Sequence, residues 1–301
     1  MMRRVTVLMG GWSSEREVSL VSGAAVAEGL RASGFAVETV DVDPDPRRLI
    51  DRLDPRPDVV FNALHGRFGE DGCIQGLLDI LGIPYTHSGL LASALAMNKP
   101  MAKQLFADVG IRVAPHRILG REEMAAGDPL PRPYVVKPVS EGSSVGVRIV
   151  RDGDNGVPTD ADAWPYGNKV MVESFVPGRE LTVAVMGDRP LAVTEITTAR
   201  GFYDYAAKYQ DGGSLHLIPA PVEQEIYDRA LDLAVGAHRV LGCRGVSRAD
   251  FRYDGDDLFI LEINTQPGMT PTSLVPEQAM HAGISFPQLV AWMVDNAECG
   301  G

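Results

Sequence analysis

Two apolar segments near the C-terminus carry four polar side chains at alternating positions. Arg248 and Asp250 are two residues apart in the first segment, and Glu262 and Asn264 are two apart in the second. Successive side chains of a strand point to opposite faces, so the members of each pair share a face. If the turn between the segments is three residues, 255–257, Asp250 lies opposite Glu262, and Arg248 correspondingly lies opposite Asn264. A two-residue turn would shift the register and separate the pairs.

These side chains predict a metal site beside phosphate groups. Two carboxylates that face each other repel unless a cation lies between them, and an all-oxygen set of Asp, Glu and Asn suits Mg²⁺ that bridges substrate phosphates. The alternative is an ordinary solvated strand face. The apolar residues around Glu262, among them Ile260 and Ile263, argue against it, because unpaired carboxylates in a buried hairpin are costly.

Two further segments could hold an anion, although each alone is also typical of a plain connection. Lys137 ends an apolar segment and is followed by the small-residue loop 141–146, which could lie against phosphates. This is not the GxxxxGK[ST] loop, because the lysine precedes the glycines. Pro267-Gly268 follows the acidic hairpin, and such a turn can aim the Gly268 N–H at developing negative charge.

Several single residues have both a structural and a functional interpretation. Glu15 follows the Gly10-Gly11 turn, where it could complement a helix dipole or hold an ammonium group. Lys99 is either a solvated helix charge or a phosphate ligand, and His65 follows an apolar strand. The tyrosine-rich loop 202–209 either closes over a ligand or packs as an Ω-loop.

Composition restricts the class of protein. The chain has 301 residues, 45% of them hydrophobic and 23% charged, which indicates two or three folded domains. A net charge of −12 without a basic block argues against a nucleic-acid partner. The three cysteines are scattered, so they favour a reducing cytoplasm over a disulfide framework or a zinc site. No apolar run approaches the roughly 20 residues of a membrane span.

The elements that must position these residues follow from the hydrophobic patterns. Strand and helix patterns alternate over residues 1–93, which predicts a parallel α/β domain whose ligands bind at the carboxyl ends of its strands. We expect a central unit over 94–179 and a third over 180–301. The third unit combines two strands over 180–197, a helix over 222–241 and the hairpin over 245–264.

Taken in order, five segments resemble the D-alanine–D-alanine ligase family. They span nearly the whole chain and are Gly10–Ser19, His65–Gly72, Val136–Gly146, Phe202–Tyr209 and Glu262–Thr270. The family belongs to the ATP-grasp enzymes. The resemblance implies an N-terminal parallel-sheet domain followed by a two-domain ATP-grasp unit that encloses ATP.

The resemblance also implies a reaction. ATP would phosphorylate the carboxylate of one D-alanine, and the amine of a second would attack the acyl phosphate, yielding ADP, phosphate and D-alanyl-D-alanine for peptidoglycan. Such chemistry needs charge neutralisation and alignment more than a covalent enzyme intermediate. We therefore expect ATP and two Mg²⁺ ions, or Mn²⁺ in their place, in a cytoplasmic homodimer that binds neither nucleic acid nor membrane.

By motif match, the resemblance assigns each site residue a role. Lys99 and Lys137 contact the ATP phosphates and Lys208 also binds the nucleotide, while Glu173 and the Val176 backbone face the base and Glu180 faces the ribose. Asp250, Glu262 and Asn264 bind the metal ions, and Arg248 and the Gly268 N–H stabilise the tetrahedral intermediate. Glu15, Ser143 and Tyr209 form a hydrogen-bonded trio, and Glu15 also receives the first ammonium. His65, Glu70 and Ser273 complete the amino-acid pockets.

Three rival functions remain to be separated by experiment or motif. A ligase that forms D-alanyl-D-lactate would use the same site, although Tyr209 favours an amine acceptor. A catalytically silent nucleotide-binding regulator could keep the fold, but the intact set of charged residues argues against it. An NAD-linked dehydrogenase is disfavoured because no GxGxxG follows the first strand.

Overall fold

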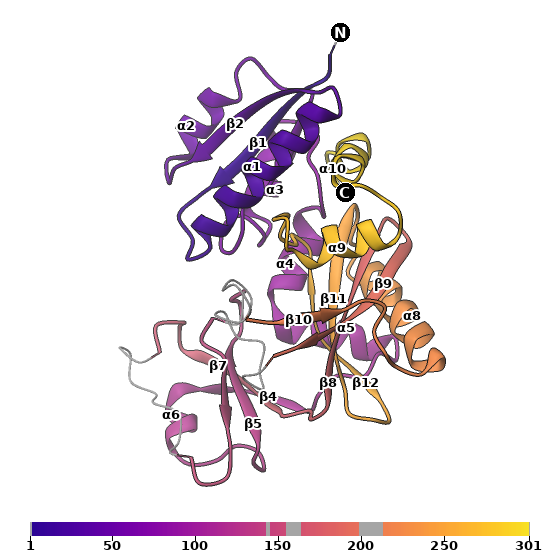
Figure 1. Ribbon diagram of the computed structural model, residues 1–301. Coiled ribbons are helices and arrows are strands. Elements are labelled where there is room, and N and C mark those ends of the chain that lie inside the picture. The colour runs from indigo at the N-terminus through magenta and orange to yellow at the C-terminus, as the bar shows by residue number, and fades with distance from the viewer. Residues whose placement is uncertain (1, 143–144, 155–163, 199–212, 301) are drawn as a thin grey trace.

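Three β-sheets organise the chain in the computed structural model, which describes residues 2–142, 145–154, 164–198 and 213–300 (Figure 1). The first sheet is parallel, the second has five strands and the third has four. This arrangement confirms the predicted combination of a parallel N-terminal sheet with α+β units.

The N-terminal sheet has the order β2-β1-β3, and both of its faces are covered. Val5 and Val7 of β1 pack on one side, while Leu8 packs on the other. Consecutive apolar residues suit such a strand because neither face meets water. The elements of this part are β1 (Arg4–Gly10), α1 (Arg16–Ala32), β2 (Ala36–Val42), α2 (Pro46–Arg52), β3 (Val59–Asn62) and α3 (Cys73–Ile80).

The five-stranded sheet has the antiparallel order β10-β9-β8-β11-β12 and carries the acidic hairpin. Apolar side chains such as Leu181, Ala249 and Phe251 pack on one of its faces against helices α5 and α8. Its elements are α4 (Leu90–Met97), α5 (Lys99–Asp108), β8 (Arg179–Met186), β9 (Arg189–Thr197), β10 (Leu215–Leu217), α8 (Gln224–Val240), β11 (Val246–Tyr253) and β12 (Leu258–Asn264).

The four-stranded sheet has the order β4-β7-β5-β6 and lies beside the five-stranded one (Figure 1). Alternation along β7 sends Val170 and Val172 into a small core and leaves Met171 and Glu173 on the other face. Its elements are β4 (His116–Gly120), α6 (Arg121–Ala125), β5 (Tyr134–Pro138), β6 (Arg148–Val150) and β7 (Lys169–Ser174).

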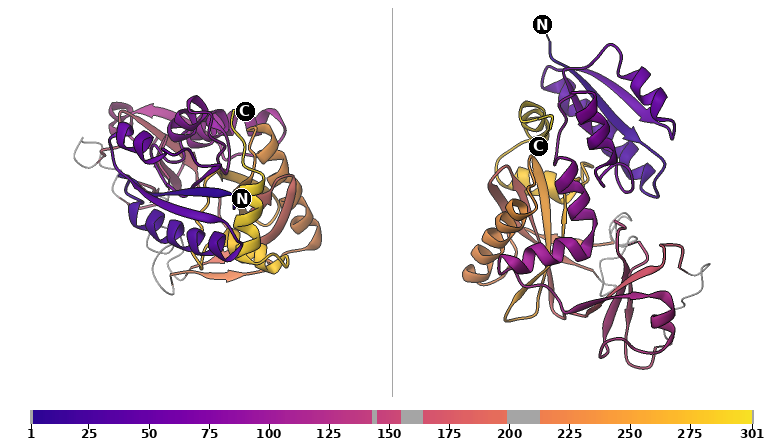
Figure 2. Two further views of the ribbon diagram at one scale, coloured as in Figure 1. Left: turned by 90° about the horizontal axis from the view of Figure 1, so that it is seen from above. Right: turned by 180° about the vertical axis from the view of Figure 1, so that it is seen from behind.

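The C-terminal helices α9 (Leu274–His281) and α10 (Phe286–Asp295) bring the chain back to its beginning (Figure 2). Leu289 and Val290 of α10 share one core with Val26 and Leu30 of α1. Helix α5, expected in the central unit, contributes Phe106 to the core of the five-stranded sheet. The exact domain limits stay predictions.

The hairpin register is the one expected, but it arises differently. Asp250 pairs with Glu262 and Arg248 with Asn264, while the connection is four residues long, 254–257, rather than three. The register shifts after Asp250, where Phe251 pairs with Ile260. This bulge at residue 261 moves Glu262 opposite Asp250, because one extra residue on a strand displaces every later pair. The three-residue turn was therefore wrong.

We predict that truncating a core leucine lowers the free energy of unfolding far more than truncating a surface leucine. Leu181 is fully buried on the central strand β8, whereas Leu91 of α4 is 64% exposed. Leu181→Ala should lower the unfolding free energy by about 2–5 kcal/mol, because it leaves a cavity that the sheet cannot fill. Leu91→Ala should change it by about 0.5 kcal/mol or less. Chemical denaturation measures both, and equal effects would contradict the assigned core.

Candidate active site

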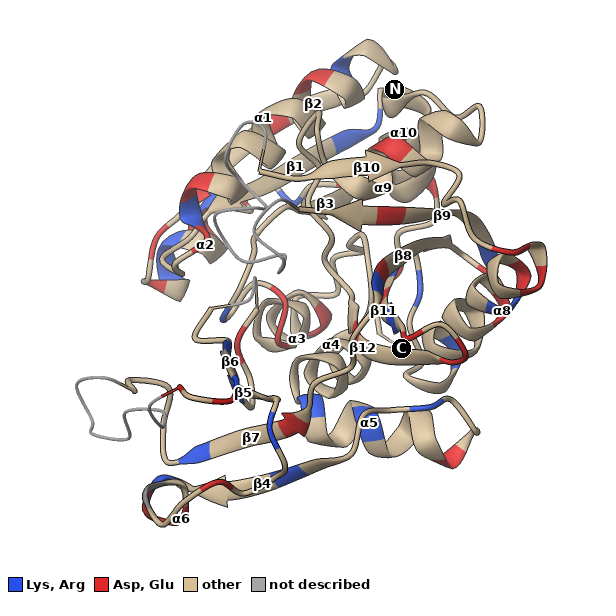
Figure 3. Ribbon diagram, turned by 60° about the horizontal axis from the view of Figure 1, so that its bottom comes forward, with Lys and Arg blue, Asp and Glu red and all other residues tan. Residues whose placement is uncertain are grey.

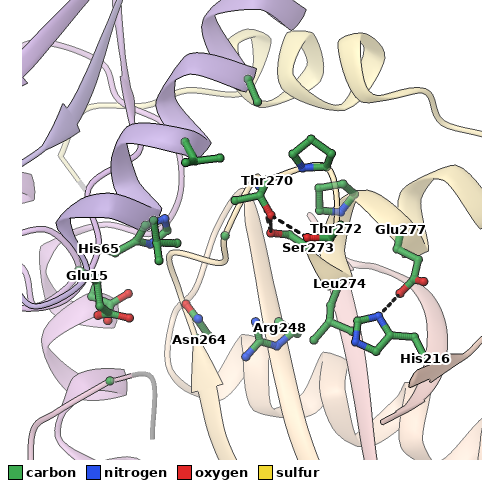
Figure 4. A pocket seen from close by; sticks show the side chains of 18 of the residues that line it. Glu15, His65, His216, Arg248, Asn264, Thr270, Thr272, Ser273, Leu274 and Glu277 are labelled. Carbon is green, nitrogen blue, oxygen red and sulfur yellow. Dashed lines mark hydrogen bonds and ion pairs between the residues drawn. The ribbon is translucent and has the colours of Figure 1, made fainter. Parts of the chain in front are cut away.

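Two cavities meet beside the acidic hairpin. The larger, of about 1490 Å³, opens among α1, the hairpin and α9, and the smaller is a slot of about 90 Å³ between the two C-terminal sheets. Lys99, Glu141 and Glu262 line both. Figure 4 shows the larger cavity, with Glu15 and His65 on one side and Asn264, Arg248 and Ser273 on the other. Groups bound in the two cavities would therefore meet at Glu262.

Carboxylates gather at the N-terminal wall of the larger cavity. Glu15 is buried just before α1, and a Cβ atom added to Gly66 would lie 2.8 Å from its Oε2. A Cβ atom on Gly142 would lie 2.8 Å from Oε1 of Glu70. Glycine thus lets both acids approach the backbone closely. Burial and the neighbouring charges of Glu15 and Glu262 raise the pKa of Glu70 well above its ordinary value. This wall suits an ammonium group.

His65 completes that wall as a neutral side chain. It is 7% exposed, and its Nε2 lies 3.4 Å from Oγ of Ser22. Burial is the main cause that lowers the pKa of His65 to about 4. At neutral pH it therefore contributes a hydrogen bond rather than a charge.

The turn after β12 approaches the opposite wall. A Cβ atom on Gly268 would lie 3.0 Å from Oγ of Ser273, which accepts a 3.0 Å hydrogen bond from the Thr270 N–H. Both Gly268 and Ser273 line the larger cavity. The structure thus places the predicted Pro-Gly turn and the predicted serine around the same cavity as the acidic wall.

Arg248 and Asp250 form a two-pronged ion pair on the polar face of the hairpin. Arg248 Nε and a terminal nitrogen donate to the two Asp250 oxygens at 2.8 and 2.7 Å, and Thr182 Oγ1 donates to Asp250 at 2.7 Å. Arg248 lines the larger cavity and Asp250 lines the slot. The pair therefore stands at the boundary between them.

Glu262 and Asn264 contact groups from other elements. Nζ of Lys99 lies 3.4 Å from Oε2 of Glu262 and donates to the Glu141 carbonyl at 2.5 Å. Oδ1 of Asn264 accepts from the Gln266 N–H at 2.8 Å. No group of three His, Cys, Asp or Glu side chains suited to a metal ion occurs in the described ranges. What the hairpin offers is two facing carboxylates and one amide, which fits an ion that also takes phosphate oxygens.

The slot has apolar lining residues together with charged residues from both flanking sheets. Val135, Val147 and Leu261 line it together with the predicted nucleotide residues, which are Lys99, Lys137, Glu173, Val176 and Glu180. Glu180 lies 3.4 Å from a terminal nitrogen of Arg252. A narrow slot in which apolar side chains and convergent charged groups meet is typical of a small-molecule site.

The buried carboxylate of Glu173, which has two lysine partners, lines the slot from the four-stranded sheet. Lys137 Nζ lies 2.5 Å from Oε1 of Glu173, and Lys103 Nζ lies 2.9 Å from Oε2. Figure 3 shows the acidic end of β7 beside basic positions of α5. Burial raises the pKa of Glu173, but the two lysines outweigh it and lower the pKa to about 2.

Sequence analysis missed Lys103, although a signal was present. Lys99 and Lys103 are four residues apart in α5, so they share a helix face with each other and with the core residue Phe106. Three predicted site residues, Ser143, Lys208 and Tyr209, lie outside the described residues.

We expect acid to destabilise the fold through its buried histidines. Burial lowers the pKa of His65 and His238 to about 4 and that of His87 to about 3. Below pH 6.5 these three histidines therefore hold more protons in the unfolded chain than in the folded one. Each histidine then lowers the free energy of unfolding by up to about 1.4 kcal/mol per pH unit, as the pH falls toward the pKa of that histidine in the folded state. The raised pKa of Glu70 opposes this trend in part.

Denaturation curves at pH 7, 6 and 5 measure this dependence. His238→Asn should reduce the slope of unfolding free energy against pH, because it removes one buried titrating group. His281→Asn is the matched control, since His281 is exposed and is hydrated in both states. An unchanged slope in His238→Asn would contradict the assignment.

Comparisons with known proteins agree with this geometry. Residues 47–88 match the family model described as the D-ala D-ala ligase N-terminus, and 105–295 match that of the C-terminus. A curated D-alanine–D-alanine ligase of Rhodospirillum rubrum is 62% identical, with 99% of each chain covered. That of Acidiphilium cryptum is 61% identical, again over 99% of each.

Solved structures give the same result. The D-alanine–D-alanine ligase of Bacillus anthracis has a TM-score of 0.86 at 32% identity, covering 98% of this chain and 97% of its own. A structure of that ligase complexed with ATP has a TM-score of 0.83 at 30% identity, with the same coverage. From the matched models, the full-length relatives and the shared fold, this chain belongs to the D-alanine–D-alanine ligase family.

Proposed function

We infer that this protein uses ATP to join two D-alanine molecules into D-alanyl-D-alanine, a precursor of peptidoglycan. The observation that carries this inference is the meeting of the two cavities at Lys99, Glu141 and Glu262. One cavity is a narrow apolar slot with buried lysines, and the other has an acidic wall. A nucleotide in the slot would extend its terminal phosphate toward an amino acid in the larger cavity.

The reaction proceeds in two displacements. A carboxylate oxygen of the first D-alanine attacks the γ-phosphorus of ATP, and ADP leaves. The amine of the second D-alanine then attacks the acyl carbon, phosphate leaves, and the nitrogen loses its extra proton. Catalysis needs alignment and charge neutralisation, because the protein forms no covalent bond with either substrate.

In the slot, Lys99 and Lys137 neutralise the ATP phosphates. Glu173 and the Val176 backbone face the base, while Glu180 faces the ribose. All five residues line the slot, which supports these roles. Lys208 is a further predicted nucleotide ligand and lies outside the described residues.

Two Mg²⁺ ions, or Mn²⁺, would be held by Asp250, Glu262 and Asn264. The facing carboxylates fit such ions, since Mg²⁺ is commonly held by one or two carboxylates plus substrate phosphates. Bound there, the ions would neutralise charge on the transferring phosphoryl group. Arg248 and Lys99 already lie against these carboxylates, so the negative charge is partly balanced before any ligand binds.

In the larger cavity, the acidic wall receives the substrates. Glu15 holds the first ammonium group, and His65, Glu70 and Ser273 complete the two amino-acid pockets. Arg248 and the Gly268 N–H stabilise the tetrahedral intermediate as fixed donors. Support comes from their common place around one cavity. Ser143 and Tyr209 remain predicted partners of Glu15.

The proposal includes a homodimer in the cytoplasm, a location that the three scattered cysteines favour. Light scattering coupled to gel filtration would test the dimer. Among the helices of the described residues, none has the length and apolar character needed to cross a membrane.

An ADP-release assay with a panel of acceptors tests the function. We expect D-alanine to give ATP- and Mg²⁺-dependent ADP release with D-alanyl-D-alanine as product, and L-alanine to give none. With D-alanine and D-lactate supplied together at neutral pH, the dipeptide should dominate. If the ester D-alanyl-D-lactate dominated, the protein would be a D-alanine–D-lactate ligase. If no ADP were released under saturating substrates, it would be the catalytically silent nucleotide-binding regulator.

Glu262→Gln tests the proposed metal site. It conserves volume but weakens metal binding, so turnover should fall on the order of a hundredfold or more with the fold retained. Glu122→Gln is the matched control, because Glu122 is exposed on α6 away from both cavities. ADP release and thermal unfolding are measured for both. Near-normal turnover in Glu262→Gln would remove this residue from the metal site.

A further inference from the structure

A fully buried lysine behind the slot has no part in the mechanism above. Lys103 is 0% exposed in α5, and its ammonium group lies 2.9 Å from Oε2 of Glu173. Of the ion pairs formed in the described part of the chain, Lys103 takes part in this one alone. Lysine is almost never fully buried unless it is paired, and burial here lowers the pKa of Lys103. A residue kept at this cost invites a functional explanation.

The partner of Lys103 is shared with a second lysine. Glu173 is 3% exposed at the end of β7, and its Oε1 contacts Lys137 at 2.5 Å. Each oxygen of the carboxylate therefore has its own cation. With both lysines present the group is held as an anion, although a buried carboxylate alone would favour its protonated form.

The two lysines differ in what they can reach. Lys137 lines the slot and can turn from Glu173 to the phosphates of a nucleotide. Lys103 is enclosed beside Ala102 and Phe106 of the core and does not line the slot. When Lys137 moves to the phosphates, Lys103 is the cation that stays with Glu173.

The charge of Glu173 matters for base recognition because this residue also lines the slot. An ionised carboxylate only accepts hydrogen bonds, whereas a protonated one also donates. Adenine presents an exocyclic amino group, which donates, and hypoxanthine presents an oxo group, which accepts. An anionic Glu173 therefore favours ATP, and a protonated one would also accept ITP.

We propose that Lys103 is a specificity-determining positioning residue, which keeps Glu173 ionised and oriented while Lys137 engages the phosphates. The slot then selects a base with an exocyclic amino group. This inference rests on the proposed assignment of the slot to the nucleotide, and it acts on the base rather than on the amino-acid substrates.

Nucleotide binding to the full-length protein tests the proposal without the reaction. Titration calorimetry gives the Kd for ATP and for ITP in Mg²⁺ without D-alanine. We expect the unsubstituted protein to prefer ATP. Lys103→Met should reduce the ratio of Kd for ITP to Kd for ATP by about tenfold or more, the size of a charge-assisted hydrogen bond.

Matched variants separate charge from packing. Lys103→Gln removes the charge but keeps a polar side chain, so it should also reduce the ratio and serves if Lys103→Met does not fold. Lys103→Arg keeps the charge and should retain more of the preference. Lys169→Met is the control, because Lys169 is exposed on the same strand as Glu173. Thermal unfolding of each variant records stability separately.

Two results would overturn the proposal. One is an equal loss of ATP and ITP binding in the neutral Lys103 variants, which would show a purely structural role. The other is an unchanged ratio of Kd for ITP to Kd for ATP in Glu173→Gln. This result would exclude Glu173 from base selection, and hence the proposed role of Lys103, even if every Lys103 variant unfolds. Where Glu173→Gln loses the preference, adding Lys103→Met should change the ratio no further.

Kinetics distinguish this inference from the proposed function. In ADP-release assays, Lys103→Met should raise KM for ATP and leave KM for D-alanine within about twofold. Failure of the unsubstituted protein to release ADP with D-alanine would sink the proposed function and leave the binding ratio measurable. Normal ADP release with an unchanged ratio would sink the role of Lys103 alone.

Discussion

Two carboxylates that face each other across a partly buried hairpin impose the constraint on which the rest of the site depends. Asp250 and Glu262 cannot turn away, because the other face of the hairpin packs in the core through Phe251 and Ile260. Their mutual repulsion is relieved by cations: Arg248 pairs with Asp250, and Lys99 of α5 approaches Glu262. A site built in this way favours ligands that bring further positive charge, as a divalent cation would.

Charge pairing also shapes the slot, where one carboxylate is paired with two lysines. Glu173 holds Lys137 and Lys103 in place. If Lys137 turned to a bound phosphate group, one buried ion pair would replace another. The ammonium group is already buried, so this change would add little desolvation cost. Positioned cations of this kind cost little reorganisation when charge moves during phosphoryl transfer.

The larger cavity exists because the two ends of the chain meet. Helix α10 packs on α1 in one core, and the turn after β12 is tied to the N-terminal sheet by hydrogen bonds. Nδ2 of Asn62 donates to Oε1 of Gln266 at 3.3 Å, and Nε2 of Gln266 lies 3.2 Å from Nδ1 of His87. These contacts hold the acidic wall around Glu15 and the turn at Gly268 around one cavity, although the two segments are far apart in sequence.

The sequence by itself determined the parallel N-terminal sheet and the shared faces of the hairpin residues, because strand alternation is a local property of the backbone. The motif resemblance extended this to the family and its reaction. Tertiary structure decided what depends on distant contacts. The bulge at residue 261 produced the correct register from a four-residue connection, and α10 reached α1. In the sequence Lys103 is one more lysine of a helix, and only the packing of β7 buries it against Glu173. Burial and charge pairing depend on neighbours in space, which no local sequence pattern specifies.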